Sequence, residues 1–525
     1  MRRYSALLLG TIAFVTLAFG SVTLGQPDPS RTLVVATEGS PPTFDPLLAG
    51  SDSRVNTPSI NIYNALYQVI PGTTEVVPEV ATGHTVSEDG LEFTFTLRDD
   101  VPFHNGSTLT ADDVAYTVER MLALRTGTFR NFGNVVGAEA LDDTTVVLRL
   151  SAPFPGMIQA LTRLYILNAD LVRANERDGD WGQTWLQNNS AGSGPYQLTS
   201  FQPEQQFVLD AIPDYWGGWH ENYAERAVFR VIREESTRRL ALQRGEVDWI
   251  RVGSADTFSE LLGQPGIVAE SQQTLNQLYF AFNTQHPNLT DARVRRALAL
   301  VYDYQGHAEV IRQGFADVAR GAIPADLPYF DDAIPQSEMN IEEARRLMAE
   351  AGYPNGGFTL DIAYDGVTAE ETAAMQLLQS GAGQLGITIR PVSVQWPTKV
   401  ELFSSLETAP GVGTIWIYPG YPDPDVFLFP LGHSSQAGQL NFAWYQNERF
   451  DELIQGARSE LDHDRRAELY AEAQQIWVED VPYANLVVGQ TLSAWRDYVH
   501  GFEASPSHAV TVHVYPMSLV GKPAR

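Results

Sequence analysis

The sequence predicts an α/β fold with more than one lobe, and three observations support this prediction. The chain has 525 residues, enough for two or three domains with sizeable cores. Residues 358–394 read as strand, helix and strand, with a stop at Gly386, and that length fits a parallel crossover. Residues 91–98 alternate apolar and polar side chains, which is the pattern of a half-buried strand.

A strand, a turn and an acid-capped helix follow one another between Gly83 and Leu122. The strand at 91–98 leads to a turn at His104–Gly106. Thr110 then stands at the N-cap position of a helix, with Asp112 and Asp113 in its first turn. Carboxylates suit the positive end of a helix, so the start of this helix is well marked. None of these residues indicates catalytic chemistry.

The first thirty residues have the plan of an export signal. Arg2 and Arg3 precede an apolar run from Ala6 to Phe19, and small residues precede Gln26. We therefore expect a cleavable signal peptide over residues 1–25 and a periplasmic, exported protein. An uncleaved membrane anchor is the alternative, because the apolar stretch nearly reaches the roughly 20 residues that span a bilayer. The chain has no cysteine, so a lipoprotein anchor is excluded.

Composition excludes several functions. The formal net charge of −29 disfavours nucleic-acid binding, because phosphate backbones repel an acidic surface. The absence of cysteine excludes disulfides and thiolate metal sites. No HExxH or GxSxG motif occurs. Together with the family resemblance given below, this leads us to expect no enzyme, no cofactor and no metal site. His508 and His513 are five residues apart and would face opposite sides of a strand, and His104 is expected to be structural.

The N-terminal part reads as strands with loops at their ends. A buried-type strand at 32–37 runs into a loop that starts with Glu38. Ligands of open α/β sheets gather at the carboxyl ends of strands, so Glu38 is a candidate ligand contact, or else a solvent-exposed loop carboxylate. The same reading predicts helices at 60–69 and 156–166 and strands at 144–150, 205–209 and 227–232.

The C-terminal part alternates helices and strands. Ser236 is expected to cap a helix that runs to about Gln243, with Gly245 following in the C′ position, and Asp291 to cap a helix over 292–302. Further helices are predicted at 340–351, at 369–385, from Asn447, and from Asp464 to 477. Strands are predicted at 278–283, 486–492 and 510–514, the last two returning to the first lobe.

The stretch Gly413–Leu431 is the most informative for binding. It combines the aromatic residues Trp416, Tyr418 and Tyr421 with the acids Asp423 and Asp425. Aromatic rings stack on ligands and acids hydrogen-bond them, which is what a binding cleft needs. Trp396 and Trp444 are further candidates. The alternative for each tryptophan is the core of a lobe, because most Trp side chains are largely buried.

The Gly83–Leu122 block resembles the "DG-hydrophobic-TF-x-LR-x-x-V-x-FH-x-G-x-x-hydrophobic-TA-x-DV" signature of family 5 extracellular solute-binding proteins. These are the peptide, nickel and oligosaccharide receptors of bacterial ABC importers. Further blocks resemble the family in the family order, and they are the loop 38–46, AGSGPY at 191–196, PDYWGG at 213–218, GEVD at 245–248, and the segments 278–283 and 291–298.

The resemblance implies a periplasmic-binding-protein-like two-lobed α/β fold of type II, cluster C, with an extra subdomain inserted in the first lobe. The expected division is a signal peptide at 1–25, the first lobe at 26–72, 190–275 and 487–525, the inserted subdomain at 73–189, and the second lobe at 276–486. Tyr279 and Asn283, at the crossing into the second lobe, join the candidate ligand contacts.

The resemblance also implies a receptor role. Such a protein captures a small solute between its lobes, and the closed form docks on the transmembrane subunits of an ABC permease, whose ATPases drive import. An oligopeptide or dipeptide is the expected ligand, and we expect a monomer. An oligosaccharide or another solute on the same scaffold, and an exported enzyme or chaperone-like binder, are the alternatives.

One position departs from the peptide-binding pattern. Peptide-binding relatives carry "W-x-x-D-Y-x-D-P", in which the first Asp pairs with the amino terminus of the ligand. Here Gly420 occupies that place, before Tyr421. A buried ammonium needs a partner, so either Asp423 or Glu38 substitutes, or the ligand has no free amine.

Overall fold

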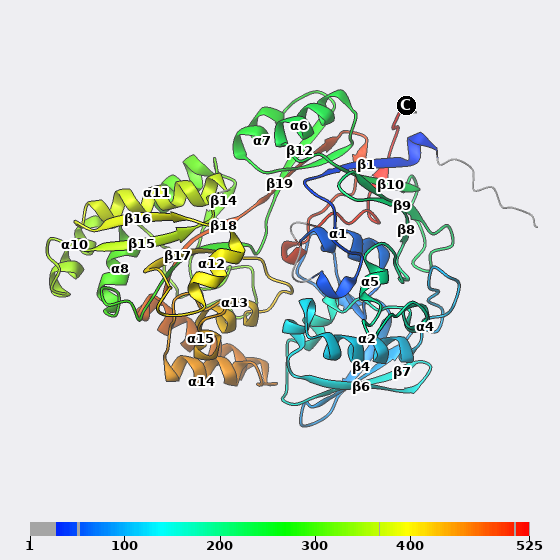
Figure 1. Cartoon of the computed structure of the whole chain (residues 1–525), viewed down its shortest axis with the longest axis horizontal. Helices are drawn as coiled ribbons and strands as arrows, with labels where there is room; N and C mark the ends of the chain where they lie inside the picture. Colours follow the sequence, from blue (N-terminus) through cyan, green and yellow to red (C-terminus); the bar gives the residue numbers. More distant parts are fainter. Residues whose placement is uncertain (1–27, 50–52, 367, 509–510, 524–525) are drawn as a thin grey trace, which may run out of the picture.

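The computed structural model describes residues 28–49, 53–366, 368–508 and 511–523. Figure 1 shows two halves joined by strands that run between them. The half on the right contains the N-terminal and C-terminal parts of the chain together with a four-stranded sheet, and the half on the left contains the middle of the chain.

A seven-stranded sheet organises the first half, in the order β12-β19-β11-β1-β10-β9-β8. Its centre is parallel, since β1 pairs in parallel with both β10 and β11, so the carboxyl ends of these three strands meet at one edge. The outer strands are antiparallel. The bounds are β1 Thr32–Thr37, β8 Tyr196–Gln202, β9 Gln206–Ala211, β10 Arg226–Val231, β11 Trp249–Val252, β12 Ile267–Gln272 and β19 Thr491–Arg496.

A four-stranded antiparallel sheet, β4-β5-β7-β6, forms the lower part of the same half. The strands are β4 Ala81–Val86, β5 Glu92–Leu97, β6 Val135–Asp142 and β7 Thr145–Leu150. Phe93, Phe95 and Leu97 point into its core, as the alternating pattern predicts. Helix α2 (Ala111–Leu124) covers the sheet, and the carboxylate of Asp113 accepts a hydrogen bond from the Thr110 backbone at 2.9 Å, which closes a capping box.

A six-stranded sheet, β14-β18-β13-β17-β15-β16, organises the second half. Apolar clusters cover both of its faces. β15 and β16 pair in parallel and flank α11, which confirms the predicted crossover unit. The bounds are β13 Gln277–Phe282, β14 Ala316–Val318, β15 Thr359–Tyr364, β16 Thr388–Ser393, β17 Val412–Ile417, β18 Tyr483–Gly489 and α11 Ala369–Gly383.

Two crossing segments join the sheets of the two halves. Residues 273–276 connect β12 to β13, and Gln490 alone connects β18 to β19. They lie side by side, because the Gly489 backbone N–H donates to the Asn276 carbonyl at 2.9 Å. Short connections that are bonded to each other provide a defined axis about which the halves can move.

The remaining helices and minor strands complete the two halves. The helices are α1 Ser53–Ile62, α3 Met157–Ala160, α4 Ala169–Ala174, α5 Gln183–Leu186, α6 Glu235–Arg244, α7 Ala255–Leu261, α8 Ala292–Leu300, α9 Tyr304–Gly306, α10 Ile341–Glu350, α12 Trp396–Phe403, α13 Asp425–Gly432, α14 Glu448–Ala457 and α15 His463–Asp480. The minor strands are β2 Tyr67–Val69, β3 Val76–Pro78, β20 Val499–His500 and β21 Ser518–Leu519.

Several sequence predictions are wrong in detail. The helix predicted at 60–69 is the end of α1 followed by β2, because the apolar residues there continue into a strand that pairs with β3. The strand predicted at 486–492 is divided between β18 and β19, which belong to different sheets. Residues 511–514 form no strand, and 509–510 lie outside the described residues.

Two predicted helix caps are also displaced by two residues. Helix α6 begins after Glu234 and α15 begins after Asp462, whose carboxylate accepts a hydrogen bond from the Arg465 backbone. More than one residue near each start could cap the helix, so the sequence leaves the register of the first turn open.

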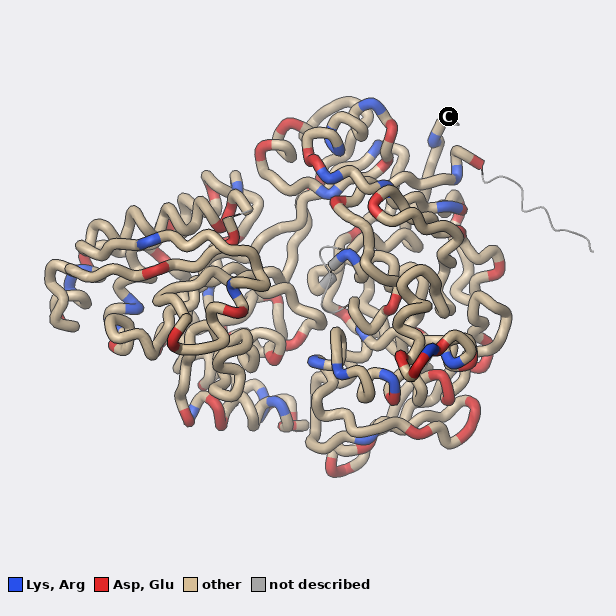
Figure 2. The backbone as a smooth tube through the Cα atoms, viewed as in Figure 1, with Lys and Arg blue, Asp and Glu red and all other residues tan. Residues whose placement is uncertain are grey.

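Acidic residues are spread over the molecule, and its helices are too short or too polar to cross a membrane in the described part of the chain. Figure 2 shows acidic positions on both halves of the molecule, as a solvated acidic surface requires. None of the helices in the described part of the chain combines the length and apolar composition needed to cross a membrane. The predicted signal peptide at 1–25 lies outside the described residues.

Candidate ligand-binding site

The nine sequence-predicted site residues separate into two groups. Tyr279, Asn283, Tyr421 and Asp423 are buried. Glu38, Trp396 and Tyr418 are exposed, and Trp416 and Trp444 are half-buried. The hydrogen bonds of each side chain show which of them has unused binding capacity.

Tyr279 and Asn283 belong to the core of the second half. The Tyr279 hydroxyl donates to the Ala322 carbonyl at 2.7 Å, and its ring has no exposed surface. The Asn283 amide donates to the Pro410 carbonyl at 3.3 Å and accepts from the Gln285 backbone at 3.1 Å. Both side chains therefore position strand β13 and its following loop in this conformation.

Tyr421 joins the two halves of the molecule. Its ring is 2% exposed and packs into the apolar cluster of the four-stranded sheet, edge-on to Phe154 at 6.4 Å between centroids. The neighbouring Gly420 carbonyl accepts a hydrogen bond from Arg163 at 2.6 Å. Residues 420–421 thus dock the second half on the four-stranded-sheet unit.

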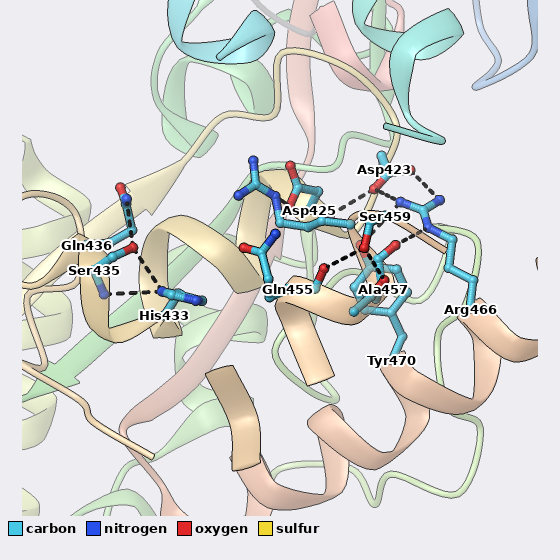
Figure 3. Close-up of polar contacts among 12 residues, drawn as sticks. Asp423, Asp425, His433, Ser435, Gln436, Gln455, Ala457, Ser459, Arg466 and Tyr470 are labelled. Carbon is cyan, nitrogen blue, oxygen red and sulfur yellow. Dashed lines mark hydrogen bonds and ion pairs between the residues drawn. The ribbon is translucent and has the colours of Figure 1, made fainter. Parts of the chain in front are cut away.

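Asp423 is occupied by an internal ion pair. Both carboxylate oxygens accept hydrogen bonds from the Arg466 guanidinium of α15, at 2.9 and 3.0 Å, as Figure 3 shows. One oxygen also accepts from the Asp425 backbone at 2.9 Å. The side chains of Asp423 and Arg466 are each 4% exposed. A carboxylate with this many partners has little capacity left for a ligand ammonium.

Glu38 lies at the carboxyl edge of the first sheet, where the sequence places it. Its side chain is 51% exposed and receives one hydrogen bond from buried Arg238 at 3.2 Å. The contact involves one carboxylate oxygen, and about half of the side-chain surface remains exposed. Of the two acids that could substitute for the residue missing at Gly420, Glu38 is the accessible one.

Tyr418 lies next to Trp416 and has an exposed side chain. It is 57% exposed, and its ring stacks on the Trp416 ring at 6.0 Å and 26°. Loss of hydration nevertheless raises the pKa of its hydroxyl group to about 12. Among the described residues, no group hydrogen-bonds to this hydroxyl.

Arg251 is a candidate that the sequence reading missed. It lies in β11, at the carboxyl edge of the first sheet, close enough to Tyr418 of the other half that its charge lowers the pKa of that phenol. Within the described part of the chain its guanidinium makes no hydrogen bond and no ion pair. The only sequence signal is its place near the end of a strand, after the GEVD block.

The other charges near Tyr418 are already balanced. Glu371 pairs with Lys399 at 3.0 Å, and Glu370 pairs with Arg312 at 3.3 Å. Arg251 is therefore the cation in this neighbourhood that lacks a protein partner among the described residues. The arrangement favours a ligand that brings a negative charge and an apolar or planar surface.

Trp396 is exposed, whereas Trp444 is half-buried and makes an internal hydrogen bond. Trp396 is 42% exposed at the start of α12. Trp444 donates its indole N–H to the Phe403 carbonyl at 3.2 Å, so its polar group is used internally. Within the described ranges, no group of three or more His, Asp, Glu or Cys residues could hold a metal ion.

Known proteins resemble this chain over most of its length. The family described as "Bacterial extracellular solute-binding proteins, family 5 Middle" matches residues 75–439. Di/tripeptide-binding protein 2 of Pseudomonas aeruginosa is 29% identical, covering 97% of this chain and 97% of the relative. Heme-binding protein A of Haemophilus influenzae is 27% identical, covering 91% and 90%.

Solved structures are similar over most of their length. The periplasmic binding protein DppA of Helicobacter pylori, in complex with the peptide STSA, has a TM-score of 0.79 and 26% identity, covering 93% of this chain and 98% of that one. HbpA2 of Haemophilus parasuis has a TM-score of 0.81 and 28% identity, covering 93% and 99%. The chain has the two-lobed α/β fold of these proteins and belongs to family 5 of the bacterial extracellular solute-binding proteins.

Proposed function

We propose that this protein is the receptor of an ABC importer and binds a short peptide between its two lobes. The observation that carries the proposal concerns Tyr418 and Arg251, which come from opposite halves. The charge of Arg251 lowers the pKa of the Tyr418 phenol, and neither side chain has a hydrogen-bonding partner among the described residues. A di/tripeptide-binding relative that matches along the whole chain supports the choice of ligand class.

Arg251 would bind the carboxylate of the peptide, and Trp416 and Tyr418 would contact its side chains. A guanidinium forms two parallel hydrogen bonds with a carboxylate, so it fixes both position and orientation. Glu38 would receive the amino group, since Asp423 is occupied by Arg466. Contacts from both lobes favour the closed state, because a ligand shifts a conformational equilibrium only through differential affinity.

The lobes would be divided at the two crossing segments. We propose a first lobe built on the seven-stranded sheet, an inserted subdomain at about 73–189, and a second lobe from about 276 to Gln490, the residue at which the chain leaves the second sheet. The closed receptor would dock as a monomer on the permease, in the periplasm. The relatives are binding proteins by name, and we propose no catalytic step.

A non-peptide solute is the second candidate. Gly420 carries no carboxylate where peptide-binding relatives carry one, and the nearby Asp423 is saturated. A ligand without an amino group, such as an acidic sugar, would use Arg251 and the aromatic surface without that carboxylate. The two candidate ligands share an anionic group that would bind Arg251, and they differ in the rest of the molecule.

Mass spectrometry of co-purified molecules tests the proposal. The mature protein is isolated natively and denatured, and the released small molecules are weighed. Peptide masses are the expected result. Masses spaced by hexose or pentose units would overturn the peptide proposal and support the second candidate. If the protein is isolated empty, a thermal-shift screen of peptides and acidic sugars decides between them, because a bound ligand raises the melting temperature.

A further inference from the structure

A cavity of about 200 Å³ lies in the first half, between the end of α1, the β2–β3 hairpin, the loop at 215–217 and the C-terminal residues Glu503, His513 and Tyr515. It is separate from Tyr418 and Arg251, which do not line it. A volume of this size is enough for several water molecules or for a small organic molecule.

Aromatic side chains make up much of the wall. They are Tyr63, Tyr67, Tyr165, Tyr215, Trp216, His513 and Tyr515. Several contact one another, as Tyr215 does with Trp216 and with Tyr515, in both cases at 5.4 Å between ring centroids. The faces of such rings carry negative potential and attract cations.

A half-buried carboxylate completes the wall. Glu79 lines the cavity, and its two oxygens accept hydrogen bonds from the Asn64 amide at 2.6 Å and the Ala65 backbone at 2.8 Å. Asn64 is 1% exposed and also donates to the Tyr215 hydroxyl at 3.0 Å, so the acid and an aromatic wall residue are held by one buried side chain.

No cation balances this carboxylate within the described residues. The causes that act on the pKa of Glu79 are burial, which raises it to about 7, and the two hydrogen bonds, which lower it. The cavity lining contains a second acid, Glu503, and no Lys or Arg. His513 is neutral near pH 7, because burial lowers its pKa to about 4.

The nearest cations outside the lining have other partners. Arg98 lies over the Trp216 ring at 4.8 Å but forms two hydrogen bonds with Asp100, each of 2.8 Å. Arg163, next to Tyr165 in the wall region, donates to the carbonyls of Gly420 and Ser507. A buried ionised carboxylate is costly unless it is paired, so the cavity is complementary to a positive charge.

From the unpaired Glu79 carboxylate and the surrounding rings, we infer that this cavity is a second binding site, specific for a small organic cation with an ammonium group. The ammonium would face Glu79 and the rings of Tyr215 and Tyr515. A metal ion fits less well, because Glu79 and Glu503 are the only carboxylates in the lining. The inference is independent of the ligand proposed for the space between the lobes.

Calorimetric titration of the mature protein with choline and with ethanolamine tests this inference. At least one of the two cations should bind with one site per chain. The neutral isostere of choline, 3,3-dimethyl-1-butanol, should bind at least about tenfold more weakly, because it lacks the charge. Equal binding of the neutral compound, or no binding of either cation, would overturn the inference.

Two variants locate the site. Glu79→Gln should weaken binding of the cation about tenfold or more, whereas Glu75→Gln, an exposed acid in the same β2–β3 hairpin region, should leave it unchanged. Tyr418→Ala should also have no effect, because Tyr418 lies outside this cavity. Unchanged binding by the folded Glu79→Gln protein, or loss of binding in Tyr418→Ala, would contradict the inference.

A readout on the native protein avoids any folding defect of a variant. Aromatic faces shield a bound group, so the N-methyl proton resonance of choline should move upfield as protein is added. Raising the pH from 6 to 8 should strengthen binding of the cation, because the Glu79 carboxyl loses its proton over that interval. An N-methyl resonance that stays in place, or affinity that does not change over this pH range, would contradict the inference.

Discussion

Residues 416–418 and residues 421–423 are neighbours in sequence and have opposite roles in the structure. Trp416 and Tyr418 form a stacked pair, and the Tyr418 hydroxyl makes no hydrogen bond among the described residues. Tyr421 is buried in the apolar cluster of the other half, and Asp423 is buried against Arg466. Both segments combine aromatic rings with polar groups. What separates them is whether the protein itself already supplies the partner.

The largest expected effect comes from breaking the Asp423–Arg466 pair. Asp423→Ala should lower the free energy of unfolding by about 3–5 kcal/mol, because it leaves a buried guanidinium without its counterion. Arg465→Ala is the control, since Arg465 pairs with Glu468 on the exposed face of α15 and should cost at most about 1 kcal/mol. Urea unfolding measures both. If the two variants lose the same free energy of unfolding, the ion pair between Asp423 and Arg466 does not stabilise the fold.

Tyr421 should matter more for stability than Tyr418. Tyr421→Ala should lower the free energy of unfolding by about 3 kcal/mol, because it removes a buried ring that bridges the two halves. Tyr418→Ala should change it by at most about 0.5 kcal/mol, because the ring is largely exposed. Thermal and urea unfolding of the two variants provide the comparison, and a reversal of their order would contradict it.

Glu79 extends the comparison to a half-buried acid that has no cation beside it among the described residues. Its pKa of about 7 in the folded protein lies above the ordinary value of 4.5, so folding favours the protonated form. The free energy of unfolding should therefore fall between about pH 5 and pH 8, by at most about 3 kcal/mol from this group.

Glu79→Gln should remove this part of the pH dependence. Unfolding of the wild type and the variant is measured at pH 5 and pH 8, with Glu75→Gln as the control for loss of an exposed acid. If the wild type and Glu79→Gln show the same change between the two pH values, Glu79 has no raised pKa.

The sequence predicted the elements well where local signals agree. The strand at 32–37 and the crossover at 358–394 are found as predicted, because alternation, length and a glycine stop point to one answer. The helix prediction for residues 60–69 was wrong, because an apolar run of that length is compatible with either helix or strand. Pairing with β3 decides in favour of a strand at β2.

The candidate site was less predictable for a physical reason. Asp423 and Arg466 are 43 residues apart, so no local pattern shows that the acid is already paired. Arg251 was missed because its importance comes from an absence of partners and from a tyrosine of the opposite half. Such features depend on tertiary contacts and become visible only in the fold.

Replacing Arg251 should weaken ligand binding with almost no change in stability. Arg251→Gln should leave the free energy of unfolding within about 0.5 kcal/mol, because the guanidinium makes no ion pair within the described residues. Its affinity for the ligand should fall about tenfold or more, since a hydrogen bond to a charged group contributes roughly 1.5–3 kcal/mol. Arg465→Ala serves again as the control for loss of one positive charge.

The most direct test of the account compares one peptide in two forms. Calorimetry measures the affinity of the wild type and of Arg251→Gln for a peptide with a free carboxyl terminus and for the same peptide with an amidated terminus. We predict that the wild type prefers the free acid by about tenfold or more and that Arg251→Gln loses this preference. If Arg251→Gln keeps the preference for the free acid, Arg251 does not bind the peptide carboxylate.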